Sequence, residues 1–210
     1  MIMRLGQQLT EIRSCPHCGV ANPVIVPVAS PQGPLVGADG RPGARWGMFQ
    51  CTTCGQALLA KGKSILNGDV ENAEIVQIIP TSREAHQDIP EPARAFLQQA
   101  YETLHAPDAA GVMAASAVDA MLKELGYREG SLYKRIDLAV EEHKLTASMG
   151  EWAHSVRLES NRPRHADKEN PNLSNAEAKQ SVNFAEALGH FLFVLSARIQ
   201  RGIEASQKTG

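Results

Sequence analysis

Several features that would assign this chain to a class at once are absent from it. The net charge is −2 over 210 residues, so no global field attracts nucleic acid, and any site for a polyanion has to be a local basic patch. No run of apolar residues is long enough to span a bilayer, and residues 1–8 carry no apolar segment followed by a cleavage site for secretion. We therefore expect a cytoplasmic protein without a membrane partner.

The chain also has no cysteine to spare for nucleophilic catalysis. Its four cysteines form two Cys-x-x-Cys pairs, Cys15 with Cys18 and Cys51 with Cys54, and a glycine follows each pair. Two intervening residues let one tight turn present both sulfurs to the same ion, and the glycine permits the positive φ that such a turn needs. Two turns of this kind predict a tetrahedral zinc site, which is structural because four thiolates leave no position for water.

Two other roles of the cysteines compete with zinc. Stable disulfides are disfavoured in a cytosolic protein, and a thioredoxin-like pair would stand where a strand meets a helix, whereas both pairs here end in a glycine turn. His17 lies inside the first pair and is a further candidate ligand. Because four thiolates already fill the shell, we expect His17 to be a surface residue.

Short apolar and β-branched runs surround the cysteine pairs. They predict four strands, near residues 23–28, 45–50, 57–60 and 74–79. A stretch rich in proline and glycine, residues 30–43, predicts a long loop between the two pairs. This pattern resembles a zinc ribbon over residues 1–80, a small sheet whose folding energy comes largely from the metal. A polar linker at residues 81–90 follows it.

Beyond the linker the hydrophobic period changes from two residues to about 3.6, which is typical of helices. The pattern predicts five helices, over residues 92–104, 107–125, 131–140, 148–156 and 174–199. Ser148 with Glu151, and Ser174 with Glu177, are spaced as capping boxes for the last two. Short connections predict an antiparallel bundle over residues 91–203, followed by a tail at 204–210. The expected fold class is α+β, a small N-terminal β zinc ribbon followed by an all-α helical bundle.

One segment, residues 157–165, stands where the fourth helical pattern stops, and we expect it to form a polar loop at one end of the bundle. It gathers three arginines, an amide and an imidazole within nine residues. Together with Lys168 it concentrates positive charge in a slightly acidic chain. Arg162, Arg164 and Lys168 are therefore the predicted nucleic-acid contacts, because phosphate groups bind to such local cations.

Residues from about 89 to 201 resemble the helical domain of unknown function that occurs beside zinc ribbons and on restriction-enzyme subunits. That domain is a relative of the HEPN superfamily (higher eukaryotes and prokaryotes nucleotide-binding). The matching features are the run Ser131–Ile136 and the spacing of Arg157, Asn161 and His165. The chain departs from the family pattern at Ser160, where the family has a glycine, and at Ala115–Ser116, where the family's second helix has an arginine.

The resemblance implies a metal-independent endoribonuclease as one function, with Arg157, Asn161 and His165 as the catalytic residues. A histidine with a near-neutral pKa can move a proton during attack by the ribose 2′-hydroxyl, and an arginine can hold the phosphate. A structural role competes with this one. In that case Arg157 pairs with Asp119 inside the bundle and His165 caps the fourth helix.

We favour a binding protein over an enzyme, because the catalytic pattern is incomplete and the net charge is slightly negative. In this interpretation the ribbon and the bundle recognise RNA, DNA or a protein partner, and the resemblance implies an accessory role in defence systems. HEPN-like bundles commonly pair, and the fifth helix carries large apolar residues from Phe184 to Ile199. These two observations predict a homodimer formed through the bundle.

Overall fold

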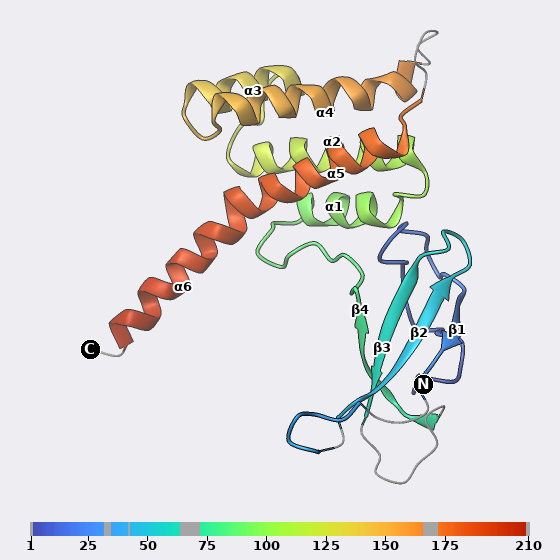
Figure 1. Ribbon diagram of the computed structural model, residues 1–210. Helices are drawn as coiled ribbons and strands as arrows, with labels where there is room; N and C mark the ends of the chain where they lie inside the picture. The colour runs from blue at the N-terminus through green and yellow to red at the C-terminus, as the bar shows by residue number, and fades with distance from the viewer. Residues whose placement is uncertain (1, 32–34, 42, 64–71, 166–171, 209–210) are drawn as a thin grey trace. The chain divides into compact units, whose positions relative to one another are not determined.

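The computed structural model of the chain describes residues 2–31, 35–41, 43–63, 72–165 and 172–208 (Figure 1). The chain divides into two compact units, Met1–Arg83 and Glu84–Gly210, and each unit has its own hydrophobic core. The fold class is α+β, with an antiparallel sheet at the N-terminus and helices after it. The division falls between Arg83 and Glu84, within the stretch that the sequence indicates as a linker.

The N-terminal unit is built on a four-stranded antiparallel sheet in the order β1-β2-β3-β4, with β1 at Ile25–Ala29, β2 at Arg45–Cys51, β3 at Ala57–Gly62 and β4 at Ile75–Ile79. Buried residues alternate with more exposed ones along β2, as expected when one face of a sheet is buried. Phe49 and Leu58 pair across β2 and β3 and are buried. The four predicted strands are present, and Cys15 and Cys51 belong to the small core beneath them.

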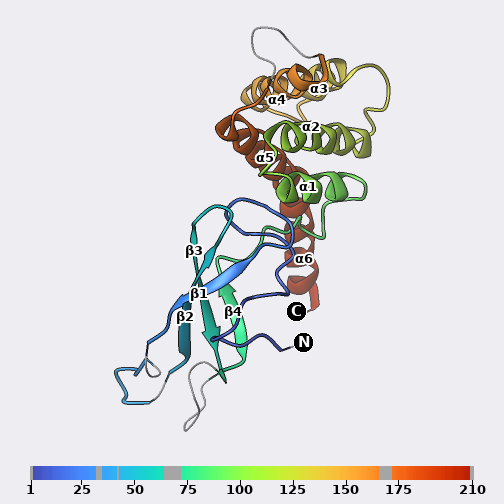
Figure 2. The same ribbon diagram turned by 90° about the vertical axis from the view of Figure 1, so that its right-hand side faces the viewer.

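The second unit is built from helices. Its elements are α1 (Ala93–Glu102), α2 (Pro107–Glu124), α3 (Leu132–Glu141), α4 (Ala147–His165), α5 (Asn175–Gly189), the π-helical turn η2 (His190–Val194) and α6 (Leu195–Lys208). The two views in Figures 1 and 2 show α3 and α4 as one layer, α2 and α5 as the next, and α1 beyond them. Because α5, η2 and α6 follow one another without a break, the described residues of this unit form the five helical segments that the sequence predicts.

Small residues allow α2 to occupy the centre of the bundle. Ala114, Ala117 and Ala120 are buried, so neighbouring helices approach the α2 backbone closely. Gly111 contributes for the same reason, because a Cβ atom built there would lie 2.6 Å from the Cδ2 atom of Leu173. The close packing of α2 against α1, α4 and α5 brings polar residues of α2 and α4 near one another.

Capping residues define two helix starts as expected and a third differently. Ser131 caps α3 by accepting a hydrogen bond from the Lys134 N–H, and Ser174 forms the expected capping box with Glu177 at α5. The expected cap at Ser148 is wrong, because α4 begins at Ala147 and the Met149 N–H donates to the Thr146 hydroxyl at 3.2 Å. Threonine caps helices as serine does, so the sequence was compatible with a cap at Thr146 as well as with one at Ser148.

The expected loop at residues 157–165 is also wrong, because α4 continues through this segment to His165 with Pro163 inside it. Ala153, Val156 and Ser160 are buried, at the three- and four-residue spacing of one helix face. Ser160 therefore extends the buried face of α4, although its hydroxyl makes it look polar in the sequence. Pro163 lies in the last turn of α4 and has no N–H, so it removes the hydrogen bond that residue 163 would donate to the carbonyl of Glu159.

The last helical segment is longer and more exposed than the sequence suggests. Residues 204–208, expected as a tail, form the end of α6. Phe184 and Leu188 of the predicted apolar stripe are buried, whereas Leu195 and Ile199 are about half exposed. Among the described residues one helical stretch, Asn175–Gln207, is long and apolar enough by length and composition to cross a membrane, a property that core helices of globular proteins share.

Candidate metal centre and cationic pocket

Two glycine-ended turns hold the four cysteines. The Gly19 N–H donates to the Cys15 carbonyl at 2.9 Å, and the Gly55 N–H donates to the Cys51 carbonyl at 2.8 Å. Both glycines have positive φ, +73° and +71°, a conformation that most other residues adopt only at a cost. As a result the Sγ atoms of Cys15, Cys18, Cys51 and Cys54 all lie within 4.8 Å of one another.

These sulfurs fit a tetrahedral metal ion. Metal–sulfur bonds of about 2.3 Å place the sulfurs of a tetrahedral site about 3.8 Å apart, and the Sγ atoms of Cys15 and Cys54 are 3.9 Å apart. All four cysteines are free thiols, which does not support the disulfide alternative. Burial raises the pKa of the Cys15 thiol to about 12, so the thiol stays protonated at neutral pH unless a cation displaces its proton. The cluster can therefore bind a metal ion through thiolates.

His17 is not part of this cluster. Its Nε2 atom lies 2.9 Å from the carbonyl oxygen of Ala57 at the start of β3, and the residue is half-buried. The imidazole thus connects the first cysteine turn to the sheet. This position agrees with the expectation that His17 is not a ligand, although the residue is less exposed than a free surface histidine.

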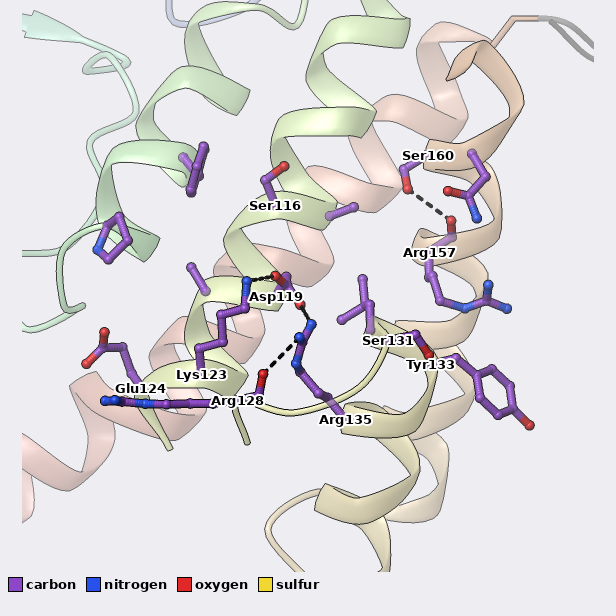
Figure 3. A pocket seen from close by; sticks show the side chains of 16 residues that line it. Ser116, Asp119, Lys123, Glu124, Arg128, Ser131, Tyr133, Arg135, Arg157 and Ser160 are labelled. Atoms are coloured by element: carbon purple, nitrogen blue, oxygen red, sulfur yellow. Dashed lines mark hydrogen bonds and ion pairs between the residues drawn. The ribbon is translucent and has the colours of Figure 1, made fainter. Parts of the chain in front are cut away.

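The helical unit contains a pocket of about 760 Å³ between α1, α2, α3 and α4 (Figure 3). Its apolar lining comes from Pro92, Phe96, Ala115, Ala120 and Leu132. Its charged lining consists of four cations and two carboxylates, namely Lys123, Arg128, Arg135, Arg157, Asp119 and Glu124. The excess of cations makes the pocket a local positive site in a chain whose net charge is −2.

Asp119 is the central carboxylate of the pocket. It accepts a hydrogen bond from the Arg135 guanidinium through Oδ1, and its Oδ2 lies 2.6 Å from the Lys123 ammonium. Arg135 also donates to the Arg128 carbonyl at 3.1 Å. Only 12% of the Arg135 side chain is exposed, so Asp119 neutralises a cation that has lost most of its water. Sequence reasoning missed Arg135 as a site residue, although it lies in the run Ser131–Ile136 that carries the resemblance.

Arg157 lies beside this network without joining it. Its guanidinium sits 5.2 Å from the ring centroid of Tyr133, and Figure 3 shows it directed toward Tyr133 and away from Asp119. Its Nε atom is buried and has no hydrogen-bond partner. The Arg157–Asp119 pair that the competing structural role requires is therefore not formed, and no carboxylate in the described part of the chain neutralises Arg157.

Two neighbours of Arg157 on α4 complete this side of the pocket. Asn161 lines the pocket, as does Ser160. The Ser160 hydroxyl donates to the Arg157 carbonyl at 2.9 Å, and its residue is 2% exposed. The structure therefore brings Arg157 and Asn161 together at one site, as the sequence suggests.

His154 and Asp137 form an acid–imidazole pair that sequence reasoning missed. The His154 Nε2 atom lies 3.0 Å from Oδ1 of Asp137, and the ring packs against Tyr133 with centroids 4.8 Å apart. The other ring nitrogen, Nδ1, is buried without a partner. Because one nitrogen is engaged and the other is inaccessible, His154 is not placed to exchange protons with a ligand in this structure.

Arg162 performs a structural task at the end of α4. Its guanidinium donates to Glu177 at 2.9 Å and to the Asn172 carbonyl at 2.9 Å. The hydrogen bond from Arg162, and those from Ser174, lower the pKa of Glu177 to about 2. Arg162 thus joins α4 to the capped start of α5, and both of its terminal nitrogens are already engaged.

The remaining predicted site residues cannot be placed in the same way. Arg164 and His165 belong to the last turn of α4, but their side chains lie outside the described part of the structure. Lys168 lies outside the described residues. The predicted roles of Arg164 and Lys168 in binding, and of His165 in catalysis, therefore remain predictions.

Comparison with known proteins places the pocket in a recognised domain. The model of a family described as a domain of unknown function, DUF4145, matches residues 98–205. This range runs from α1 into α6 and includes the pocket residues from Ala115 to Asn161. No curated protein and no solved structure matches the chain.

Proposed function

The chain belongs to the DUF4145 family, and from this premise we propose that its helical unit is a binding module for single-stranded nucleic acid. The pocket supplies the phosphate-binding cations. In this proposal the unit is HEPN-like and the protein is an accessory or recognition factor, not an enzyme. The HEPN-like relationship and a role in defence systems rest on the sequence resemblance at Ser131–Ile136 and at Arg157 and Asn161.

The observation that carries this proposal is the state of Arg157. A guanidinium without a carboxylate partner is destabilising in a partly buried position. Among the described residues, the contact that Arg157 makes through its charge is with the Tyr133 ring. A phosphate group would supply the missing negative charge and accept the hydrogen bonds that the guanidinium offers. Arg157 is therefore the residue that we expect to contact the nucleic-acid backbone most directly.

Other residues of the pocket support a single-stranded ligand. The Tyr133 side chain is 50% exposed, and an exposed aromatic ring beside cations offers a stacking surface to an unpaired base. Arg128 is exposed and lines the pocket, so it can approach a neighbouring phosphate, whereas Lys123 beside it is paired with Asp119. Asn161 adds an amide that can donate to phosphate or to a base edge.

We propose further that the N-terminal unit is a zinc ribbon and that zinc occupies its cysteine cluster. Four sulfurs at tetrahedral spacing are the preferred ligand set of structural zinc, and the free thiols suit the reducing conditions of the cytoplasm. Cys15 and Cys51 lie in the core of this unit, so the metal would replace part of the hydrophobic core that so small a sheet lacks. The zinc would stabilise the fold and take no part in a reaction.

The test is the binding of a fluorescent single-stranded RNA to the full-length protein over a salt series. We expect affinity to fall steeply as salt rises, because bound phosphates release counterions. Arg157→Ala should weaken binding to all sequences alike and reduce the slope of log K against log salt by about 0.7, the value for one phosphate contact on a single strand. Lys144→Ala is the control, because Lys144 is exposed and does not line the pocket.

The outcomes separate the proposal from its competitors. Absence of binding, or binding that does not depend on salt, would remove the polyanion function. If Arg157→Ala and Lys144→Ala lost the same amount of RNA affinity, the effect would be one of overall charge, and the pocket would be rejected as the binding site. A single DNA strand of the same sequence in parallel reveals whether the 2′-hydroxyl contributes.

The metal-independent endoribonuclease remains the alternative that the same assay can detect. None of the described residues that line the pocket is a histidine, and His154 has no accessible ring nitrogen. In this alternative His165 carries the proton transfer, as the resemblance implies. Cleavage of the RNA in the presence of a chelator, lost in His165→Ala while binding persists, would establish the enzyme in place of the binding module.

A further inference from the structure

The two sides of the cationic pocket differ in chemistry. The α1 side supplies the apolar residues Pro92 and Phe96, whereas the side formed by α3 and α4 includes the guanidinium groups of Arg135 and Arg157. Figures 1 and 2 show α2 between α1 and the layer of α3 and α4. An apolar surface and a cationic surface therefore border the same cavity from opposite sides of α2.

Phe96 is the aromatic residue on the apolar side. It is half-buried, and it packs against the hydrophobic core of the helical unit while it also lines the pocket. Tyr101 and Phe184 do not have this double position, because they are buried and are not among the residues that line the pocket. The core contact holds the Phe96 ring in place, and the part of the side chain that the core leaves uncovered borders the cavity.

Small side chains of α2 give the pocket its depth. Ala115, Ser116 and Ala120 line it between its two sides, and the Ser116 hydroxyl donates its proton to the Val112 carbonyl at 2.8 Å. The volume of about 760 Å³ falls within the range of pockets that enclose a whole small molecule, roughly 300–1,000 Å³. The cavity therefore has room for more than a phosphate group.

We propose that the pocket admits one unpaired purine of the single strand, with the base stacked on Phe96 and the phosphate bound at Arg157. A nucleotide has the same two-sided character as the pocket, with a flat and largely apolar base at one end and an anion at the other. Stacking tolerates every base because each has a π-face, but a purine offers a larger face than a pyrimidine. Phe96 then sets the base preference of the site, an assignment that rests on the proposed binding function.

Tyr133 is less suited to hold this base inside the pocket. The centroid of its ring already lies 5.2 Å from the Arg157 guanidinium, and Figure 3 shows the ring directed away from the central carboxylate, Asp119. A base stacked on Tyr133 therefore stays at the outer edge of the site, while the next base along the strand enters toward Phe96. The two aromatic residues thus serve adjacent bases, with Arg157 at the phosphate that joins them.

Strands that lack bases separate stacking from phosphate binding. The full-length protein is titrated with a fluorescent strand of tetrahydrofuran abasic nucleotides, and with the same strand carrying a single adenine or a single thymine. The adenine should raise the affinity about fivefold or more, the lower limit for a base stacked on an aromatic side chain, and the thymine should raise it less. The all-abasic strand should bind with the steep salt dependence of phosphate contacts.

Three variants assign the gain from adenine to the Phe96 ring. Phe96→Leu should lose most of this gain while its affinity for the all-abasic strand and its salt slope stay as in the wild type, because leucine keeps an apolar contact with the core but has no π-face. Phe96→Tyr keeps the ring and should keep the gain. Phe191→Leu is the matched control and should also keep the gain, since Phe191 in η2 is 44% exposed and is not among the residues that line the pocket.

The outcomes distinguish the role of Phe96 from the binding function itself. Salt-dependent binding of the all-abasic strand without a gain from adenine would overturn the base site and leave the polyanion function standing. Absence of salt-dependent binding would remove both. A full gain from adenine in Phe96→Leu would place the base elsewhere, and an equal loss of affinity for all three strands in that variant would show that Phe96 acts only through folding. Either result would overturn the assignment of Phe96.

Discussion

Replacing Asp119 by alanine should destabilise the helical unit and, at the same time, strengthen its binding to polyanions. The carboxylate is 22% exposed and holds Arg135, whose side chain is 12% exposed. Removing one partner of a buried ion pair leaves the other charge without compensation, which costs about 3–5 kcal/mol when burial is complete. Arg135 keeps the Arg128 carbonyl as an acceptor, so we expect the lower end of this range.

A loss of about 3 kcal/mol corresponds to a change of about 150-fold in the folding equilibrium, since 1.4 kcal/mol is a factor of ten. Urea unfolding followed by far-UV circular dichroism at 222 nm measures it, because the helices dominate that signal. The double variant Asp119→Ala with Arg135→Met should recover much of the loss, because the unpaired charge is removed together with its partner. Asp137→Asn is the control, since Asp137 is 42% exposed and should cost less than 1 kcal/mol.

Binding should change in the opposite direction. Asp119 places a negative charge among the pocket cations, and its removal frees Arg135 and Lys123 to meet phosphate. We therefore expect tighter binding of single-stranded RNA and a steeper salt dependence, measured at a temperature where the variant is folded. A variant that is both less stable and no better at binding would refute the role of Asp119 as the charge that restrains this pocket. Unchanged stability would refute the inference that Arg135 depends on it.

The remaining predictions concern the metal and the α4–α5 junction. Elemental analysis of protein purified without added metal should find one zinc per chain. Cys51→Ser should abolish zinc binding while leaving the far-UV helical signal largely intact, because the helical unit has its own core. Absence of metal from the wild type would refute the zinc ribbon. The pKa of Glu177 is lowered to about 2, so its ion pair with Arg162 contributes stability that is complete above the ordinary pKa of 4.5 and is lost as pH falls toward 2. Thermal unfolding should therefore lose less stability between pH 5 and pH 3 in Arg162→Met than in the wild type, and parallel pH profiles would contradict this assignment.

Local chemistry was sufficient to predict a large part of this protein. The two cysteine turns, with their glycines at positive φ, depend only on residues that are adjacent in the chain, and so does the capping box of Ser174 and Glu177. The four strands follow from short apolar runs of period two. These features could be inferred because each is stabilised mainly by neighbours within a few residues.

The end of α4 could not be predicted in the same way. Ser160 and Pro163 both argue for a loop by local preference, and burial of Ser160 against the bundle overrides that preference. Whether a serine is exposed or buried depends on which helix packs against it, and that contact comes from residues far away in the sequence.

The sequence by itself determined which residues this protein has available, namely four thiols at metal-binding spacing and a set of cations with Asp119 among helical segments. Only the tertiary structure decided which of them meet. Asp119 binds Arg135 and Lys123, because the packing of α3 against α2 brings Arg135 to the carboxylate, while α4 presents Arg157 to Tyr133 instead. The tertiary structure also decided that Leu188 is buried whereas Leu195 and Ile199 are about half exposed. The physical reason is that an ion pair or a buried face needs atoms within a few ångströms, and the order of residues in a chain does not specify those distances between helices.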